Sequence, residues 1–160
     1  MGKVRYCMDV DAAENATPET TAKAMAYELH ISPKHALEVC RALKGKRVEA
    51  AERYLEAVLE KKEAIPYKRH KKKVAHRRGL NKWYAGGYPV KASAEILKIV
   101  RNAKRNAEYK GLEAEDMTIW HIATKNGRAL RGIYPRAFGR ATPKNTDTVT
   151  IELILKEKGS

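Results

Sequence analysis

The sequence has only two cysteines, Cys7 and Cys40, which lie 33 positions apart and form no Cys-x-x-Cys pair. This spacing fits neither a zinc site nor a disulfide framework, so we expect a reduced, cytoplasmic compartment. No apolar run approaches the roughly 18 residues that a membrane-spanning helix needs. The amino-terminal residues contain no apolar stretch typical of a secretory signal, and we therefore expect neither secretion nor membrane insertion.

Acidic residues are missing from two long segments. The first runs from Ala64 to Ala94 and holds nine Lys and Arg, and the second, from Met117 to Thr146, holds six. The net charge is +14, yet outside these segments the remaining 18 basic residues face all 19 acidic ones. Concentrated cations bind phosphate backbones through the release of counterions, which favours a nucleic acid as the partner. The alternative is a basic face kept for solubility, but such a face usually mixes both signs of charge.

The first acid-free segment contains a stretch without amphipathic period, residues 64–90, which we call the basic insertion. Its cations alternate with Tyr67, Trp83, Tyr84 and Tyr88. Rings beside cations are suited to phosphate contact and to stacking on exposed bases, although the same rings could anchor the loop on its own domain. The candidate RNA-binding residues of both segments are Lys68, Arg69, Lys71, Lys72, Lys73, Arg77, Arg78, Lys82, Lys125, Arg128, Arg131, Arg136, Arg140 and Lys144.

The stretch Lys125–Lys144 carries six cations, three glycines and two prolines, and it lies between two expected strands. A loop of this length is uncommon in a compact domain and is usually either functional or disordered. Tyr134 and Phe138 argue against simple disorder. We interpret the stretch as the tip of a long hairpin that lies against a polyanion.

The remaining pattern predicts three helices and three strands. Ser32-Pro33 is a helix start, Gly45 is a plausible helix end, and Gly111 closes a later helix. The helices are expected from Pro33 to about Gly45, from about Val48 to Ile65-Pro66, and from about Lys91 to Lys110; the strands are Lys23–Ile31, Met117–Thr124 and Thr148–Leu155. This order predicts an α+β fold in which helices pack against an antiparallel sheet.

The predictions of the first and the last strand along the sequence depend on the alternation of apolar and polar residues. Thr148–Leu155 alternates cleanly and is the clearest strand in the chain. In Lys23–Ile31 the period of two indicates a half-buried strand, although a helix is also compatible with these residue types. The apolar side of that strand is expected to carry Met25, Tyr27, Leu29 and Ile31.

No group of residues indicates catalysis or a bound metal. His70 and His76 lie among cations, which disfavour a metal ion, and His35 and Cys40 do not share a helix face well. A metal-dependent nuclease would need clustered carboxylates beside its RNA-binding surface, and the acids avoid both basic segments. We expect no enzyme, metal or cofactor; an RNA-processing or RNA-modifying enzyme that uses the same basic surface is the alternative, and a DNA-compacting protein is a third possibility.

Three motifs then carry a resemblance. Ser32-Pro33-Lys34-His35-Ala36, Asn106-Ala107-Glu108 and the string Pro135-Arg136-Ala137-Phe138-Gly139-Arg140-Ala141 occur in this order. On these residues the chain resembles the ribosomal protein L22 family of the large subunit, called L17 in the eukaryotic scheme, over nearly its whole length. The basic insertion, together with the amino-terminal arm, is similar to archaeal and eukaryotic members, and the lack of a long carboxyl-terminal tail after Leu155 favours an archaeal source.

The resemblance implies one domain, residues 1–160, with three helices packed on a small antiparallel sheet and one long protruding β-hairpin. Within it we expect an amino-terminal arm at 1–21, which docks loosely, the basic insertion at 64–90, and the extended hairpin at 117–155 with its tip at about 127–143. The role implied is structural, in the cytoplasm within the large subunit, with no catalytic residues, no cofactor and no homo-oligomer.

The resemblance also implies partners and positions. The globular part is expected to bind large-subunit (23S-type) ribosomal RNA near the mouth of the polypeptide exit tunnel, with neighbouring ribosomal proteins beside it. The hairpin would line the tunnel wall, where it meets the nascent polypeptide. The tunnel-lining tip would consist of Arg128, Arg131, Tyr134, Pro135 and Arg136, with Arg140 beside it.

Overall fold

The computed structural model describes residues 6–8 and 19–157, and its centre is a three-stranded antiparallel sheet with the order β1-β7-β4. The sheet strands are β1 (Thr21–Leu29), β4 (Thr118–Asn126) and β7 (Val149–Lys156). The helices are α1 (Pro33–Leu43), α2 (Val48–Leu59) and α3 (Val90–Tyr109). The short ribbon strands are β2 (Ile65–Pro66) paired with β3 (Gly86–Gly87), and β5 (Ile133–Pro135) paired with β6 (Ala141–Pro143). The predicted α+β fold, with three helices and an antiparallel sheet, is confirmed.

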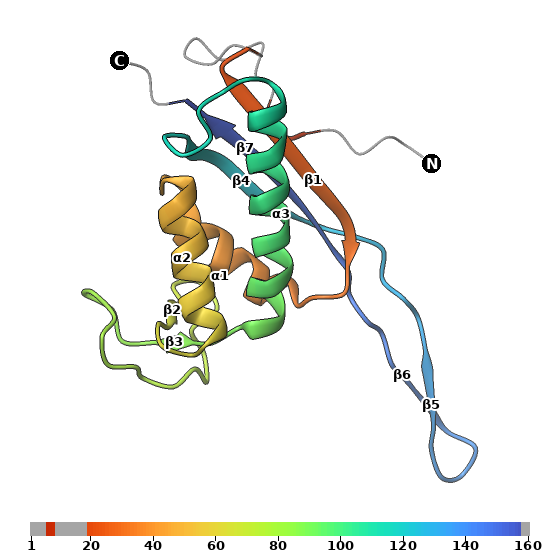
Figure 1. Ribbon diagram of the computed structural model, residues 1–160. Coiled ribbons are helices and arrows are strands. Elements are labelled where there is room, and N and C mark those ends of the chain that lie inside the picture. The colour runs from red at the N-terminus through yellow and green to blue at the C-terminus, as the bar shows by residue number, and fades with distance from the viewer. Residues whose placement is uncertain (1–5, 9–18, 158–160) are drawn as a thin grey trace.

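The helices cover one face of the sheet and share a single hydrophobic core with it. α1 lies against β4, α3 lies against β1 and β7, and α2 packs on α3 (Figure 1). α3 buries an apolar stripe whose members are each at most 5% exposed. These members are Ile96, Ile99, Val100, Ala103 and Ala107.

The ends of α1 follow from local sequence signals. Ser32 precedes the helix with an extended backbone, and Pro33 occupies its first turn, where a missing N–H costs nothing. Gly45 follows the helix with a φ of +82°, a conformation that carries a steric penalty for residues with a Cβ. α2 ends at Leu59, several residues before Ile65-Pro66, which instead forms β2.

The predicted strand β1 is confirmed, but its predicted buried side is correct only in part. Ala22 and Ala24 face the core at 0% and 3% exposure, whereas Tyr27 is 54% exposed. Glu28 has a φ of 50°, and the register with β7 shifts between Ala26 and Leu29. Such a bulge moves the following residues to the opposite face, so a single period of two cannot describe the strand. After the bulge, Leu29 and Ile31 pack in the core as predicted.

The strand β7 lies at the centre of the sheet and is covered on both sides. Its apolar residues face the helices, while Ile154 packs on the other face against Tyr6, Met8 and Trp120. Glu152 also points to that second face and is completely buried. The polar side of the alternation is therefore a second, smaller interior and not a solvated surface.

Beyond the sheet, β4 and β7 continue into a long hairpin that projects away from the helices (Figure 1). Leu130 and Thr146 exchange two backbone hydrogen bonds of 2.9 Å, and the Lys144 N–H donates to the Gly132 carbonyl at 2.7 Å. The ribbon of β5 and β6 extends the pairing toward the tip. At Gly132 a Cβ would lie 2.9 Å from the Lys144 carbonyl oxygen. The two sides of the hairpin therefore approach this closely only because residue 132 is glycine.

The basic insertion has no helix and is held by short backbone pairings. β2 pairs with β3, His76 forms an isolated bridge with Ala85, and the Arg77 N–H donates to the Tyr84 carbonyl at 2.8 Å. Of the arm expected at residues 1–21, most lies outside the described residues. No helix in the described parts of the chain has the length and hydropathy of a membrane span.

Candidate nucleic-acid interface

Thirteen of the fourteen candidate cations have exposed side chains, and they fall into two groups. None of the ion pairs within residues 6–8 and 19–157 includes any of these thirteen. Their charge is therefore directed to solvent and not neutralised by the fold. The group in the basic insertion is Lys68, Arg69, Lys71, Lys72, Lys73, Arg77, Arg78 and Lys82, and the hairpin group is Arg128, Arg131, Arg136, Arg140 and Lys144.

Lys125 is the exception among the candidates. Its side chain is 25% exposed, and its ammonium group lies 2.8 Å from a carboxylate oxygen of the buried Glu152. His121 bonds the other oxygen at 2.9 Å, and the backbone N–H of Cys7 donates to the same carboxylate at 3.0 Å. Lys125 thus takes part in an internal polar cluster, which the sequence pattern did not indicate.

The pKa of Glu152 reflects opposing influences in this cluster. Burial is the largest and raises the pKa, but hydrogen bonds from Lys125, His121 and Cys7 together lower it below the ordinary value of 4.5. The hydrogen bond to Glu152 also raises the pKa of Lys125. The carboxylate is therefore charged at neutral pH and joins the amino-terminal residues 6–8 to the sheet.

The aromatic residues of the basic insertion divide between anchoring and exposure. Tyr67 is 5% exposed, and its ring meets that of His35 edge-on with centroids 5.7 Å apart. Trp83 donates from its indole N–H to the Tyr67 carbonyl at 2.9 Å and stacks on Tyr84 at 5.2 Å. Tyr84 is 45% exposed, and the ammonium of Lys71 lies 6.0 Å from its ring centre. Tyr67 therefore anchors the loop, while Tyr84 presents an accessible ring beside a cation.

A buried glutamate on α1 positions the start of the basic insertion. Glu38 is completely buried, and its carboxylate accepts hydrogen bonds from the backbone N–H groups of Lys68 at 3.0 Å, Arg69 at 2.8 Å and His70 at 2.7 Å. Three consecutive amides form a concave anion-binding site, which compensates for the burial of the carboxylate. The sequence offered one signal, since Glu38 interrupts the apolar side of α1 next to Val39.

The hairpin ends in a tight turn with an exposed aromatic ring. Phe138 and Gly139 have φ values of 58° and 65°, and the Arg140 N–H donates to the Ala137 carbonyl at 3.3 Å. Positive φ at both central positions is typical of a type I′ turn, which a phenylalanine disfavours. Phe138 is 98% exposed, and no side chain of the described fold covers it. The tip therefore presents a strained, uncovered ring beside Arg136 and Arg140.

The other tip residues expected to line a tunnel wall are also accessible. Tyr134 is 49% exposed, and the ammonium of Lys144 lies 4.6 Å from the centre of its ring. Pro135, Arg128 and Arg131 are exposed. Rings and cations thus alternate along the projecting part of the hairpin.

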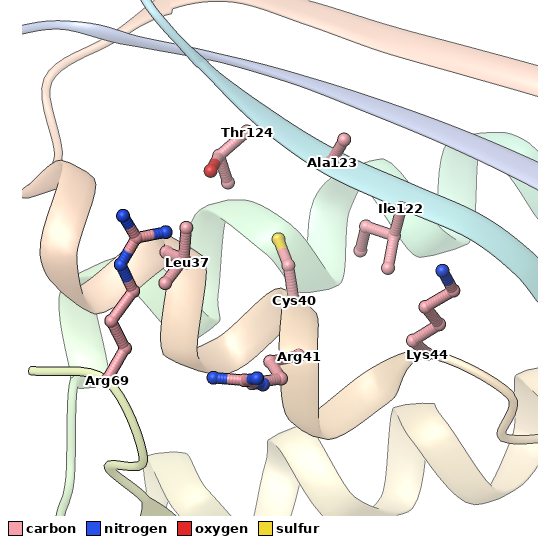
Figure 2. A pocket seen from close by; sticks show the side chains of 8 residues that line it. All are labelled: Leu37, Cys40, Arg41, Lys44, Arg69, Ile122, Ala123 and Thr124. Carbon is pink, nitrogen blue, oxygen red and sulfur yellow. The ribbon is translucent and has the colours of Figure 1, made fainter. Parts of the chain in front are cut away.

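A hollow of about 350 Å³ lies between α1 and β4, and we call it the α1–β4 hollow. Figure 2 shows Arg69 and Lys44 at opposite ends, with Leu37, Cys40 and Ile122 between them. Burial raises the pKa of the Cys40 thiol to about 12, so this group is an uncharged part of the apolar floor. Arg41, Ala123 and Thr124 complete the lining. Arg41 and Lys44 were missed as candidates because they lie outside the two acid-free segments.

The geometry offers no metal-binding arrangement among the residues described. Within ranges 6–8 and 19–157, no three His, Cys, Asp or Glu side chains gather as a metal site would require. Both cysteines are free thiols. The structure presents exposed cations, accessible aromatic rings and loops whose backbone is held by hydrogen bonds. These features suit a phosphate-rich partner.

Comparison with known proteins gives a consistent result. A family described as ribosomal protein L22p/L17e matches residues 24–156. A protein from Archaeoglobus fulgidus named large ribosomal subunit protein uL22 is 58% identical over 96% of this chain and 96% of its own. Proteins of the same name from Methanocella arvoryzae and Methanocaldococcus jannaschii are 50% and 47% identical; each match covers 98% of this chain, and 99% and 97% of the relatives. All three organisms are archaea.

Proposed function

Because this chain belongs to the ribosomal protein L22p/L17e family, we propose that it is a structural constituent of the large ribosomal subunit and binds its RNA. The chain is not an enzyme. Its partners are then ribosomal RNA and neighbouring ribosomal proteins, and its place of action is the large subunit in the cytoplasm. The archaeal relatives that support this proposal are named large ribosomal subunit protein uL22, and they match nearly the full length of this chain.

The thirteen exposed cations are the proposed RNA-binding residues. Eight lie in the basic insertion and five in the hairpin, with no acidic partner among the ion pairs of the described residues. Arginine binds phosphate in a bidentate manner and also stacks on bases, so these side chains are suited to an RNA surface. We expect recognition mainly through backbone and shape, without a linear base code.

The hairpin is the proposed tunnel-lining element. The observation that supports this assignment is the projecting ribbon whose tip exposes Phe138, Arg136 and Arg140 with nothing in the described fold to cover them. Apart from the pairing of its own two strands, an element of this kind gains further stability from a partner outside the chain. RNA would contact the cations along the ribbon. The residues proposed to face the nascent polypeptide are Arg128, Arg131, Tyr134, Pro135 and Arg136.

Sedimentation of a native extract tests the ribosomal assignment. The large-subunit fraction is washed in high salt and probed for this protein, with a known large-subunit protein probed in parallel. Retention at about one copy per particle is expected for a structural constituent. A protein that washes off, or that sediments elsewhere, would contradict the proposal.

Charge reversal tests the hairpin assignment. Arg136→Glu with Arg140→Glu is expected to lower incorporation into subunits or to alter the tunnel wall, while the free protein stays folded because both side chains are exposed. The matched control is Arg53→Glu with Lys98→Glu, since these cations are already paired with glutamates on their own helices. Equal occupancy and an unchanged tunnel wall in both double variants would contradict the hairpin assignment.

A further inference from the structure

We propose that the α1–β4 hollow is a nucleotide-binding site in which one unstacked base of the ribosomal RNA enters the apolar floor while its flanking phosphates contact Arg41, Lys44 and Arg69. The inference rests on the proposed function and deepens it, because it assigns to the same RNA partner a defined recognition site that also uses residues outside both acid-free segments. Arg41 and Lys44 belong to neither acid-free segment.

The floor of the hollow has the chemistry of a base-binding slot. Leu37, Cys40 and Ile122 form it, and the last two, at 4% and 7% exposure, belong to the hydrophobic core. At about 350 Å³ the hollow falls in the range of small-ligand sites, roughly 300–1,000 Å³. Single-stranded RNA bases that leave the stack are commonly held by apolar or aromatic surfaces.

The rim determines the charge of the occupant. Arg41, Lys44 and Arg69 have exposed side chains, and the eight residues that line the hollow include no acidic side chain. No ion pair among the described residues uses any of these three cations. The hollow thus has three unneutralised charges around an apolar floor. A nucleotide within an RNA chain complements this arrangement, because its ring is flanked by phosphates.

Glu38 gives the rim a defined geometry. Its buried carboxylate accepts the Arg69 N–H at 2.8 Å and the N–H groups on either side, so the backbone that carries Arg69 is attached directly to α1. Arg41 and Lys44 project from the same helix or its immediate end. All three cations are therefore positioned relative to one element, although Arg69 lies far from the other two in sequence. Figure 2 shows the Arg69 side chain at one end of the hollow, near Leu37.

The test uses the full-length protein and protein-free large-subunit ribosomal RNA from the same organism. Leu37→Trp fills the hollow with a larger ring, and Arg69→Gln removes one rim charge. Base-specific chemical modification of the RNA is compared with and without each protein, and affinity is measured over a series of salt concentrations. Thermal unfolding checks that each variant folds.

For wild type we expect protection of the base edge of at least one single-stranded nucleotide. In the Leu37→Trp complex that nucleotide regains reactivity, and affinity falls by about tenfold, since the apolar contact of one base is lost. Arg69→Gln changes an exposed side chain, so the variant is expected to fold. It should weaken the same protection and reduce the slope of log affinity against log salt concentration by about one. The controls are Leu59→Trp on α2 and Arg53→Gln, which lie off the hollow and should leave this protection intact.

The outcomes separate the two proposals. If wild type does not bind large-subunit RNA at all, the proposed function fails. If wild type binds but Leu37→Trp and Arg69→Gln give the same protections as their controls, the nucleotide site is overturned and the ribosomal assignment stands. An effect of Leu37→Trp that occurs only in assembled subunits, and not in the complex with RNA alone, would assign the hollow to a neighbouring protein and would also overturn the proposal.

Discussion

The buried carboxylate of Glu38 accepts a 2.8 Å hydrogen bond from the backbone N–H of Arg69, across 31 positions of the sequence. It also accepts the N–H groups of the residues on either side, Lys68 and His70. A single acidic side chain of the core thus holds the backbone of the most basic part of the chain. The cationic side chains of this segment remain free for a partner because the backbone, and not the side chains, forms the attachment.

Substitution of Glu38 tests this attachment. Glu38→Gln is expected to destabilise the fold by about 1–3 kcal/mol, because the amide NH₂ faces N–H donors and leaves buried groups unpaired. Hydrogen exchange at the amides of residues 68–70 should accelerate more than at α3. Glu108→Gln, on the exposed side of α3, is the control and should leave both quantities unchanged. Equal exchange rates in the two variants would show that Glu38 does not hold the loop.

The acid stability of the protein should depend on Glu152. The folded state lowers the pKa of this carboxyl below its ordinary value of 4.5, so its stabilising contribution is complete above that value. The contribution is lost as the pH falls through the lower, folded-state pKa. Glu152→Gln is expected to reduce the free energy of unfolding at pH 7 by about 1–3 kcal/mol, as for hydrogen bonds to charged groups.

The measurement is chemical denaturation of wild type and Glu152→Gln at a series of pH values. The difference between the two curves should be largest near neutral pH and should shrink below about pH 4.5. A constant difference across this range would mean that the Glu152 carboxyl has the same pKa in both states. Glu157→Gln, beyond the end of β7, provides a matched substitution outside the cluster.

Gly132 is expected to control the pairing of the hairpin. In Gly132→Ala the new Cβ would lie 2.9 Å from the Lys144 carbonyl oxygen, which belongs to the backbone and cannot rotate away. The two sides of the hairpin must separate locally, and the hydrogen bond from the Lys144 N–H to the carbonyl of residue 132 should weaken. Faster hydrogen exchange at Lys144 and Thr146, with an unchanged sheet, would be the expected result. Gly111→Ala serves as comparison, because it has a positive φ but no close neighbour within 4 Å.

Phe138 is expected to lower the free energy of unfolding of the free protein. Phe138→Asn keeps the turn but replaces a bulky residue at a φ of 58° with one that tolerates this conformation, a gain of about 1 kcal/mol or less. Hydrogen exchange at Arg136 and Arg140, measured on the free protein, should slow. If the same variant assembles into subunits as well as wild type does, the exposed ring is not required for the proposed contact at the tip.

Much of the fold follows from local sequence. The stripes of α1, α2 and α3 repeat with helical spacing, and Pro33 and Gly45 mark the ends of α1 through conformational preferences of single residues. The absence of acidic residues from two segments is also a property of the sequence alone, and it identified the thirteen cations that the structure exposes. The family could be recognised from short motifs at the start of α1 and at the hairpin tip.

Other features depend on contacts between distant positions. The bulge at Glu28 reversed the buried face of β1, and the covering of β7 on both sides turned Glu152 into a buried partner of Lys125. Neither has a local signal, because strand order and register decide which face is covered.

The sequence by itself determined the helices, the strands, the antiparallel class and the concentration of positive charge, since each depends on neighbouring residues or on composition. Only the tertiary structure decided that Arg69 lines the same apolar hollow as Arg41 and Lys44, and that Glu38 holds the Arg69 backbone there. The physical reason is that burial and hydrogen-bond partners belong to pairs of residues that folding brings together, and a linear pattern contains no information on such pairs.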